Sequence, residues 1–539
     1  MSAGVDAVAA AIGAGRGILG IELGSTRIKA CLIGDDASTV LASGSYEWEN
    51  ELVDGVWTYS LDTVWSGLQA AYADLVSDVT RQFMVTPRSF RAIGISAMMH
   101  GYLAFDDRGE LLVPFRTWRN TSTGDAAAEL TSLFDMNIPL RWSIAHLHQA
   151  VLDAEPHVPE VRLLTTLAGY VHWKLTGRTV LGVGDASGMF PIDPVTGDYN
   201  ADLLDRYDRL VGSGPLATPL RRLLPEVLVA GQSGGELTAE GASLLDPTGA
   251  LEPGVLLSPP EGDAGTGMVA TNAIAPRTGN VSAGTSIFAM VVLERPLRHL
   301  HHEIDIVTTP VGDPVAMVHC NNGASELAAW AGLFQRFSEA AGTPVDSDGV
   351  YDILFREALD GAPDAGGLFA YNQLAGEPIA GLDEGRPLFV RTPDSRLNLA
   401  NVMRAQLYGV FGTLALGMRV LADESVALDR MYAHGGMFRT AGVAQRFLAG
   451  ALDAPVSTSL TAGEGGAWGM AVLAAYAAQT VEGAEGAGTD LATFLRDDVF
   501  AATELITASP DPDDVSGFAH YLDRYRDGLD VVRAAILAL

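Results

Sequence analysis

The sequence predicts a mixed α/β fold made of two related halves, and three observations support this. Apolar strand-like runs alternate with helix-like stretches along nearly the whole chain. A hairpin pattern of apolar strand, turn with Gly and Ser or Thr, and second apolar strand occurs at residues 17–33 and again at 281–288. The chain has 539 residues, which is too many for one ordinary hydrophobic core, so we expect at least two domains.

Composition excludes several classes of protein. An apolar share of 48% with 19% charged residues describes a globular chain. The formal net charge of −32, from 66 acidic and 34 basic side chains, argues against nucleic acid and anionic membrane surfaces as partners. We attribute the acidity mainly to solubility. A nucleotide bound here would need Mg²⁺ and convergent N–H groups to reverse the local field.

The two cysteines and the N-terminus bear on the compartment. Cys31 and Cys320 lie in apolar runs and offer neither a disulfide framework nor a metal-ligand spacing, which fits a reducing compartment. No basic region precedes the short Ala-rich stretch at the start, and no apolar run reaches the length of a membrane span. We therefore expect a cytoplasmic protein with no membrane partner.

The first half begins with a small, Ala/Gly-rich segment, residues 1–16, that we expect to be a flexible leader. The strand–turn–strand pattern of 17–33 follows, and apolar spacing then predicts a helix over 57–75. Further elements are a buried strand at 90–96, a hairpin at 102–112 and a mostly helical region at 124–176 that ends at Gly177.

The second half repeats the alternation of strands and helices. A strand is expected at 428–433, and Gly, Asp and Pro predict a loop-rich insertion over 480–515. The expected helices are 322–337, 399–421, 442–452, 470–478 and 523–537.

Two glycine-rich segments suggest the chemistry. Asp263 stands among glycines in the stretch 261–267, where small neighbours allow a substrate to approach the carboxylate. Gly284, Thr285 and Ser286 form a turn whose N–H and hydroxyl groups suit phosphate oxygens. A base beside a phosphate-binding turn is what phosphoryl transfer to a hydroxyl requires. Each segment alone is weak, because most aspartates in such stretches are turn residues.

The order of seven motifs makes the case stronger. They are the first hairpin, Met99-His100-Gly101, Asp185-Ala186-Ser187-Gly188, Gly262-Asp263-Ala264-Gly265, Ser282-Ala283-Gly284-Thr285-Ser286, Gly435-Gly436 and Glu464-Gly465-Gly466-Ala467-Trp468-Gly469. With these, the chain resembles the FGGY carbohydrate kinases of the actin/hexokinase/Hsp70-like ATPase superfamily, and most of all the xylulose kinases. The resemblance implies two actin-like (ribonuclease H-like) domains, each a mixed sheet flanked by helices, with a cleft between them.

The same resemblance implies domain roles and site residues. Residues 17–274 would bind the sugar and supply the first phosphate hairpin and the catalytic Asp263, while 275–539 would bind the nucleotide. Asp263 would take the proton from the sugar hydroxyl, and Glu22 and Asp263 would bind Mg²⁺. The sugar contacts would be Met99, His100, Trp118, Asn120 and Asp263. The ATP contacts would be Gly24, Ser25, Thr26, Lys29, Gly284, Thr285, Ser286, Gly435, Gly436, Gln445, Gly465 and Gly466, with Glu464 beside the last two.

Four positions depart from the family pattern. Glu22 stands where the family usually has Asp, and inside an apolar strand its carboxylate is costly without a partner, which favours a functional role. Asn120-Thr121 replaces Asn-Asp, and Met98 stands where Gln often precedes Met-His. His434 occupies the place of a frequent third glycine. The first departure bears on catalysis and the next two on the identity of the sugar.

The resulting prediction is an enzyme, a carbohydrate kinase that phosphorylates a small ketose with ATP and Mg²⁺ to give sugar phosphate and ADP. A ketopentose such as xylulose is the first choice. Ribulose, fuculose or glycerol are alternatives, and so is a non-catalytic ATP-binding switch on the same fold. The expected partners are the sugar and ATP, and a homodimer is left open.

Overall fold

The structure is a computed structural model that describes residues 2–212, 214–216, 218–459, 465–483 and 488–539. The chain forms two compact units. The first consists of Met1–Ile274, Ile306–Pro314 and Gly463–Ala502, and the second of Ala275–Asp305, Val315–Ala462 and Thr503–Leu539. Two segments inside the range predicted for the second domain, 306–314 and 463–502, thus pack with the first unit.

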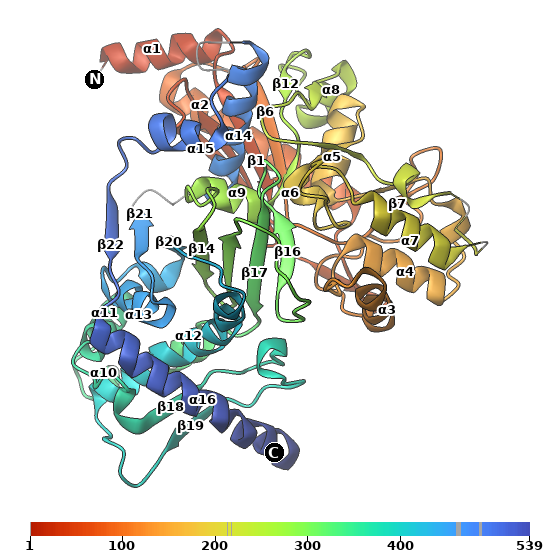
Figure 1. The fold of residues 1–539 in the computed structure, drawn as a ribbon. Coiled ribbons are helices and arrows are strands. Elements are labelled where there is room, and N and C mark those ends of the chain that lie inside the picture. Colours follow the sequence, from red (N-terminus) through yellow and green to blue (C-terminus); the bar gives the residue numbers. More distant parts are fainter. Residues whose placement is uncertain (1, 213, 217, 460–464, 484–487) are drawn as a thin grey trace. The chain divides into compact units, whose positions relative to one another are not determined.

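The sheet of the first unit has the strand order β11-β12-β6-β1-β2-β3, with β13 also paired to β6. Its strands β12, β6 and β1 are labelled in Figure 1. β1 runs antiparallel to β2 and parallel to β6, and five of its six residues are buried. The bounds are β1 (Ile18–Leu23), β2 (Arg27–Ile33), β3 (Val40–Glu47), β6 (Ala92–Ala97), β11 (Gly235–Glu236), β12 (Leu256–Leu257) and β13 (Glu261–Gly262).

The sheet of the second unit repeats this order strand by strand. β17, β15 and β14 are antiparallel neighbours, β20 and β21 follow in parallel, and β22 closes the edge antiparallel. The same sequence of directions is found in β3, β2, β1, β6, β12 and β11. The bounds are β14 (Thr278–Ala283), β15 (Ile287–Val292), β17 (Pro314–Cys320), β20 (Arg430–His434), β21 (Val456–Ser459) and β22 (Leu505–Ala508). The alternation of strands and helices in the sequence therefore predicted the α/β class correctly.

Helix α14 (Gly465–Val481) packs directly on β1 and β6 of the first unit (Figure 1). Glycines make this close approach feasible. A Cβ atom at Gly20 would lie 2.1 Å from the Ala467 carbonyl oxygen, and one at Gly94 would lie 2.7 Å from that of Met470. No side chain other than hydrogen fits at either position, so these glycines fix the distance between helix and sheet.

The other helices cover the sheets or form peripheral layers. The first unit has α1 (Ser2–Gly13), α2 (Leu61–Phe83), α3 (Gly124–Phe134), α4 (Ser143–Leu152), α5 (Leu167–Thr176), α6 (Val183–Ala186), α7 (Ala201–Val211), α8 (Ala239–Leu245), α9 (Asp263–Ala270) and α15 (Leu491–Phe494). The second has α10 (Ser325–Ala340), α11 (Ser347–Ala358), α12 (Leu399–Asp423), α13 (Val443–Leu452) and α16 (Pro512–Ala538). The short remaining strands are β4 (Glu51–Val53), β5 (Val56–Thr58), β7 (Leu103–Phe105), β8 (Leu163–Thr165), β9 (Val180–Gly182), β10 (Glu226–Leu228), β16 (Asp305–Thr308), β18 (Leu368–Tyr371) and β19 (Leu388–Arg391).

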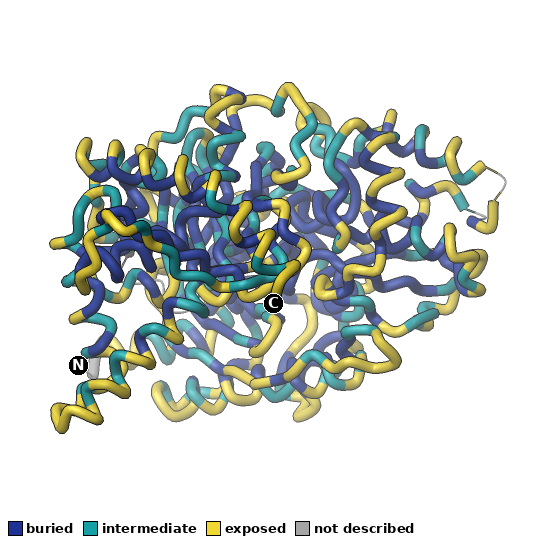
Figure 2. Tube along the Cα trace, turned by 90° about the horizontal axis from the view of Figure 1, so that it is seen from below, coloured by how far each residue is buried: buried dark blue, intermediate teal, exposed yellow. Residues whose placement is uncertain are grey.

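The segment expected to be a flexible leader contains the helix α1, whose high alanine content favours helix formation and whose residues are largely exposed (Figure 2). Its flexibility stays a prediction. One region differs from the sequence-based expectation. The range expected to be a loop-rich insertion contains β22 and the start of α16. Asp511 caps that helix by accepting a hydrogen bond from the Asp513 N–H, and Pro512 occupies its first turn. Residues that resembled loop signals are thus helix-start signals.

One of the described helices, α12, has the length and mean hydropathy of a membrane span. Its apolar window has a mean hydropathy of 1.2, and 72% of that window is buried inside the second unit. This degree of burial is what a core helix of a folded unit shows.

The buried histidine of α4 leads to a prediction about pH. His146 is 0% exposed, and neither ring nitrogen has a hydrogen-bond partner among the described residues. Burial, with a smaller effect of Arg116, lowers its pKa to about 3. Because the unfolded chain binds a proton at this residue below its ordinary pKa of about 6.5, stability is full above that pH and falls as the pH drops.

We expect proton uptake by this residue in the unfolded chain to lower the free energy of unfolding by about 2 kcal/mol between pH 7 and pH 5. Denaturant titrations at both pH values should show a smaller pH dependence for His146→Met than for the native chain. The same substitution at exposed His302 serves as the control. An unchanged pH dependence in His146→Met would contradict the assignment.

Candidate functional site

Asp263 lies where β13 passes into α9, as the first residue of that helix. Its Oδ1 atom accepts a hydrogen bond from the Met99 N–H at 3.2 Å, and its side chain keeps solvent access. Desolvation raises its pKa, whereas the N–H groups of Met99, Ala264 and Asp263 itself and the charge of Arg141 lower it. The result is a fixed, reachable carboxylate of the kind that a general base requires.

Glu22 lies near the end of β1, opposite Lys29 of β2 and Ser96 of β6. Desolvation and the nearby charge of Asp263 raise its pKa to about 7, while Lys29 and a hydrogen bond from the Ala467 backbone lower it. Gly466 presses against this carboxylate, since a Cβ there would lie 2.1 Å from Oε1 of Glu22. Glu22 and Asp263 therefore form a pair of carboxylates with Lys29 as the neighbouring cation.

This pair fits a magnesium ion that arrives with a nucleotide. No group of three His, Cys, Asp or Glu side chains able to hold a metal is present in the part of the chain that the structure describes. Mg²⁺, however, commonly uses one or two carboxylates together with water and phosphate oxygens. A divalent cation there would offset the burial and the Asp263 charge, which raise the pKa of Glu22. Glu22 and Asp263 as magnesium ligands remain a prediction.

Met99 and His100 follow the buried strand β6 and are themselves each 5% exposed. His100 has a φ of 71°, a backbone conformation that residues other than glycine rarely adopt and that often marks functional sites. Its Nδ1 atom lies 3.3 Å from the Gly188 carbonyl oxygen, and its ring stacks on Trp142. Met99 donates to Asp263 through its backbone, so these two predicted sugar contacts lie beside the predicted base.

Trp118 and Asn120 occupy different environments from each other. Trp118 is 38% exposed and its ring is open to a ligand. Asn120 is buried, and its side-chain amide is occupied by the chain itself: Nδ2 donates to the carbonyls of Trp57 and Thr117, and Oδ1 accepts from the Trp57 N–H. Asn120 thus fixes the backbone of this loop, and its contact with sugar stays a prediction.

Two buried carboxyl groups behind Asp263 were not assigned a role from the sequence. Glu261 accepts hydrogen bonds from the N–H groups of Gly184 and Asp185, and Asp185 accepts one from Thr166 Oγ1 at 2.5 Å. Burial, together with their mutual repulsion, raises the pKa of Glu261 to about 8, and burial raises that of Asp185 to about 7. They hold the Gly184–Gly188 turn against His100. The only sequence signal for this pair of carboxyl groups is the Asp-Ala-Ser-Gly motif, which contains Asp185. Burial of a carboxyl group cannot be predicted from such a motif.

The first hairpin turn belongs to the same unit. The Gly24 N–H donates to the Arg27 carbonyl, the Trp48 indole donates to the Gly24 carbonyl, and the Tyr59 hydroxyl donates to the Ser25 carbonyl. These bonds occupy carbonyl oxygens. The N–H groups of Ser25 and Thr26 have no acceptor among the described residues, and both residues are exposed. Such a turn can bind an anion, and Lys29 lies in the following strand.

The second hairpin turn, in the second unit, is built in the same way. The Gly284 N–H donates to the Ser286 carbonyl at 2.9 Å, and the carbonyls of Gly284 and Thr285 accept bonds from Ala324 and Gly323. The N–H groups of Thr285 and Ser286 have no acceptor within the described ranges. As in the first hairpin, the carbonyls are occupied and two N–H groups remain for a ligand.

The predicted adenosine contacts are only partly accessible. Gly435 has a φ of 109°, and a Cβ there would lie 2.3 Å from the Ala283 carbonyl oxygen, so only glycine brings this loop against β14. Gly436 is exposed. Gln445 is 2% exposed, and its Nε2 atom donates to the carbonyls of Val456 and Ile506, where it joins β21 to β22. Gly465 begins α14 with a φ of 56°, and Glu464 lies outside the described residues.

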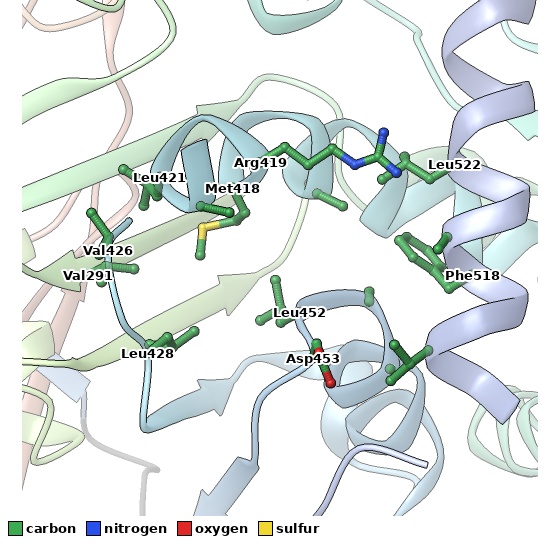
Figure 3. Close-up of a pocket in the computed structure, with 16 residues that line it drawn as sticks. Val291, Met418, Arg419, Leu421, Val426, Leu428, Leu452, Asp453, Phe518 and Leu522 are labelled. Atoms are coloured by element: carbon green, nitrogen blue, oxygen red, sulfur yellow. The ribbon is translucent and has the colours of Figure 1, made fainter. Parts of the chain in front are cut away.

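A pocket of about 220 Å³ in the second unit lies away from these residues, between α12, α13 and α16 (Figure 3). Its wall is mostly aliphatic, and its charged residues are Arg419 and Asp453. Arg419 is already paired with Asp523 at 2.9 Å. The pocket includes none of the predicted site residues, so we do not assign the chemistry to it.

Comparison with known proteins adds the family relationship. The N-terminal domain of the FGGY family of carbohydrate kinases matches residues 17–250, and the C-terminal domain of that family matches residues 279–478. No curated protein sequence gives a significant match.

Solved structures resemble the chain along its whole length. A xyloylose kinase from Brucella ovis has a TM-score of 0.76 at 20% identity, covering 96% of this chain and 100% of that chain. A gluconate kinase from Lactobacillus acidophilus has a TM-score of 0.74 at 17% identity, covering 96% and 98%. A glycerol kinase from Plasmodium falciparum, solved with ADP, has a TM-score of 0.72 at 12% identity, covering 95% and 97%. At these identities the likeness is one of fold.

Proposed function

This chain belongs to the FGGY family of carbohydrate kinases, and from that premise we propose that it transfers the γ-phosphoryl group of ATP to a hydroxyl group of a small ketose. The acceptor is a ketopentose such as xylulose, and the products are the sugar phosphate and ADP. The structural neighbours include kinases named for xylulose, gluconate and glycerol, so the sugar is the open part of the proposal.

The observation that carries the proposal is the placement of Asp263. Its carboxylate is held by the Met99 N–H, is open to solvent and lies beside Glu22, and the Met-His pair is next to it. In the reaction Asp263 accepts the hydroxyl proton of the sugar while the new O–P bond forms and the bond between the γ-phosphorus and the β-γ bridging oxygen breaks. ADP leaves with the electrons of that bond.

The remaining residues orient the reactants and stabilise charge. The N–H groups of the two hairpin turns, Ser25-Thr26 in one unit and Thr285-Ser286 in the other, are suited to bind phosphate oxygens, where charge develops in the transition state. When bound, Mg²⁺ neutralises phosphate charge, and Glu22 and Asp263 are the residues that would hold it. Met99, His100 and Trp118 are proposed to orient the sugar.

The test is the rate of ADP release from Mg·ATP with D-xylulose, L-xylulose, D-ribulose, L-ribulose, L-fuculose and glycerol. We expect one ketopentose to raise the rate at least tenfold above the water-only background. A panel in which only glycerol or L-fuculose works would keep the kinase and replace the sugar. A flat panel with intact ATP binding would contradict the kinase proposal and favour a nucleotide-binding switch, for which Glu22 in place of the family's aspartate is the supporting observation.

We further propose a cytoplasmic location, with no nucleic acid or membrane partner. The strongly acidic balance and the absence of a disulfide between Cys31 and Cys320 support this. Assembly as a homodimer is a separate question that the elution volume of the purified chain in size-exclusion chromatography would answer.

A further inference from the structure

A buried polar network in the second unit lies behind the turn formed by Gly284, Thr285 and Ser286. Its centre is Glu377, which is 0% exposed and follows β18 in the chain. Oε2 of Glu377 accepts hydrogen bonds from the backbone N–H of Asn322 at 3.1 Å and from Asn322 Nδ2 at 3.0 Å. Oε1 has no partner among the described residues. Burying a carboxyl group costs desolvation free energy, so a buried glutamate at this position indicates a structural or functional role.

Asn322 is bound from several sides. Its Oδ1 atom accepts hydrogen bonds from the N–H groups of Leu374 and Ala375, each at 2.9 Å. Asn372 Nδ2 donates to the carbonyls of Asn322 and Gly323, at 3.2 and 2.9 Å. The segment 372–377 therefore binds both the side chain and the backbone of Asn322, and this fixes the loop at 321–324.

This loop in turn holds the phosphate-binding turn. The Gly323 N–H donates to the Thr285 carbonyl at 2.7 Å, and the Ala324 N–H donates to the Gly284 carbonyl at 2.8 Å. A Cβ at Gly323 would lie 2.4 Å from the Gly284 carbonyl oxygen, so loop and turn are in direct contact. Both carbonyls of the turn are thereby fixed, and this sets the direction of the N–H groups that remain for a ligand.

We propose that Glu377 is a positioning residue for the nucleotide phosphates: through Asn322 it fixes loop 321–324, and through Gly323 and Ala324 it orients the N–H groups of Thr285 and Ser286. The inference rests on the proposed function, because it takes that turn as the phosphate site. Glu377 itself touches neither substrate nor phosphate. Its importance lies in preorganisation, since donors that are already aimed at the phosphates need no reordering when the nucleotide binds.

The test uses two substitutions at one position. Glu377→Met keeps a side chain of similar length and removes the acceptor of the Asn322 backbone N–H. Asn322 Nδ2 loses one of its two acceptors and keeps the Ala375 carbonyl at 3.1 Å. Glu377→Gln keeps one acceptor oxygen for the same two N–H groups and places its NH₂ where Oε1 now stands. We expect Glu377→Met to weaken ADP binding, measured by isothermal titration calorimetry of the full chain with Mg²⁺, at least tenfold. Glu377→Gln should stay within threefold of the native chain.

Kinetics provide a second readout with the sugar identified in the panel. We expect the KM for ATP to rise and kcat at saturating ATP to fall in Glu377→Met, because the turn N–H groups bind oxygens that gain charge in the transition state. The KM for the sugar should stay within threefold of the native value. A general loss of stability would instead lower the amount of active protein and leave the KM for ATP unchanged.

Glu424 provides a matched control in the same unit. It is also buried, at 4% exposure, and its carboxylate accepts hydrogen bonds from the His301 ring at 2.9 Å and the Arg298 N–H at 3.1 Å. It has no hydrogen bond to the turn or to loop 321–324 among the described residues. We expect Glu424→Met to lower the thermal midpoint without changing the affinity for ADP.

Asn372→Ala keeps the proposal testable if Glu377→Met does not fold. It removes two hydrogen bonds to loop 321–324 and leaves Glu377 in place, and we expect ADP affinity to fall about threefold to tenfold. The proposal is overturned if Glu377→Met and Asn372→Ala bind ADP within twofold of the native chain, or if Glu424→Met loses as much affinity. Failure of the native chain to bind ADP at all would overturn the proposed function instead.

Discussion

Replacing Asp263 by Asn is expected to abolish most sugar-dependent ADP release while leaving the binding of ADP in the absence of Mg²⁺ nearly unchanged. The asparagine keeps the shape of the side chain and an oxygen that accepts the Met99 N–H, but it cannot take a proton from a hydroxyl group. Loss of a general base costs roughly 10²–10⁴-fold in kcat. Steady-state kinetics with the best sugar of the panel measure the turnover, and calorimetry with ADP measures the binding.

Asp106 is the matched control for this substitution. It is a turn aspartate of the same unit, whose Oδ1 accepts hydrogen bonds from the N–H groups of Arg108 and Glu110. If Asp263 were only a turn residue, Asp263→Asn and Asp106→Asn would reduce turnover alike. We expect Asp106→Asn to keep turnover within twofold of native. Retention of more than a tenth of native kcat in Asp263→Asn would exclude it as the base.

The second large effect concerns stability of the second unit. Asp514 of α16 is 1% exposed, accepts a hydrogen bond from buried Arg404 of α12, and binds Arg446 of α13 with an Nε–Oδ2 distance of 2.5 Å. Asp514→Ala would leave the Arg404 charge, which is 2% exposed, without its carboxylate. Removing one partner of a buried ion pair costs about 3–5 kcal/mol, so we expect a loss of that size in denaturant unfolding of this unit.

An exposed ion pair on the same helix provides the comparison. Arg533 and Asp530 of α16 lie 2.7 Å apart with both side chains largely in solvent. Asp530→Ala should cost less than about 1 kcal/mol. Combining Arg404→Met with Asp514→Leu removes both buried charges, and we expect it to recover most of the stability lost in Asp514→Ala. Equal losses in Asp514→Ala and Asp530→Ala would show that the buried pair contributes little.

The repeated strand–turn–strand patterns predicted the fold class because the first and the second hairpin form for the same local reasons. An apolar run makes a strand buried on two faces, and a Gly with Ser or Thr makes the turn. The match of β1 with β14 and of β2 with β15 is therefore visible in sequence. The position of Asp263 next to Met99 and Glu22 depends on the pairing of β6 with both β1 and β13, which chain order alone does not give.

Other features depend on contacts that no local pattern contains. Asn120 and Gln445 are polar residues in motif-like positions, yet their amides are occupied by backbone groups far away in the chain. Glu261 and Glu377 are ionisable, and their burial arises only when distant segments pack around them. Local propensity also failed at Asp511 and Pro512, because the same residues mark either a loop or the start of a helix.

The late position of α14 in the chain has a consequence for synthesis. β1 and β6 leave the ribosome early, but the helix that covers them through Gly20 and Gly94 ends at Val481. Chains emerge N-terminus first, at several residues per second. The face of the first sheet that α14 covers in the folded chain therefore stays exposed while nearly the whole second unit is translated. The nascent chain should be a client for chaperones during this interval, and truncation before residue 465 should yield aggregating protein rather than an independent N-terminal domain.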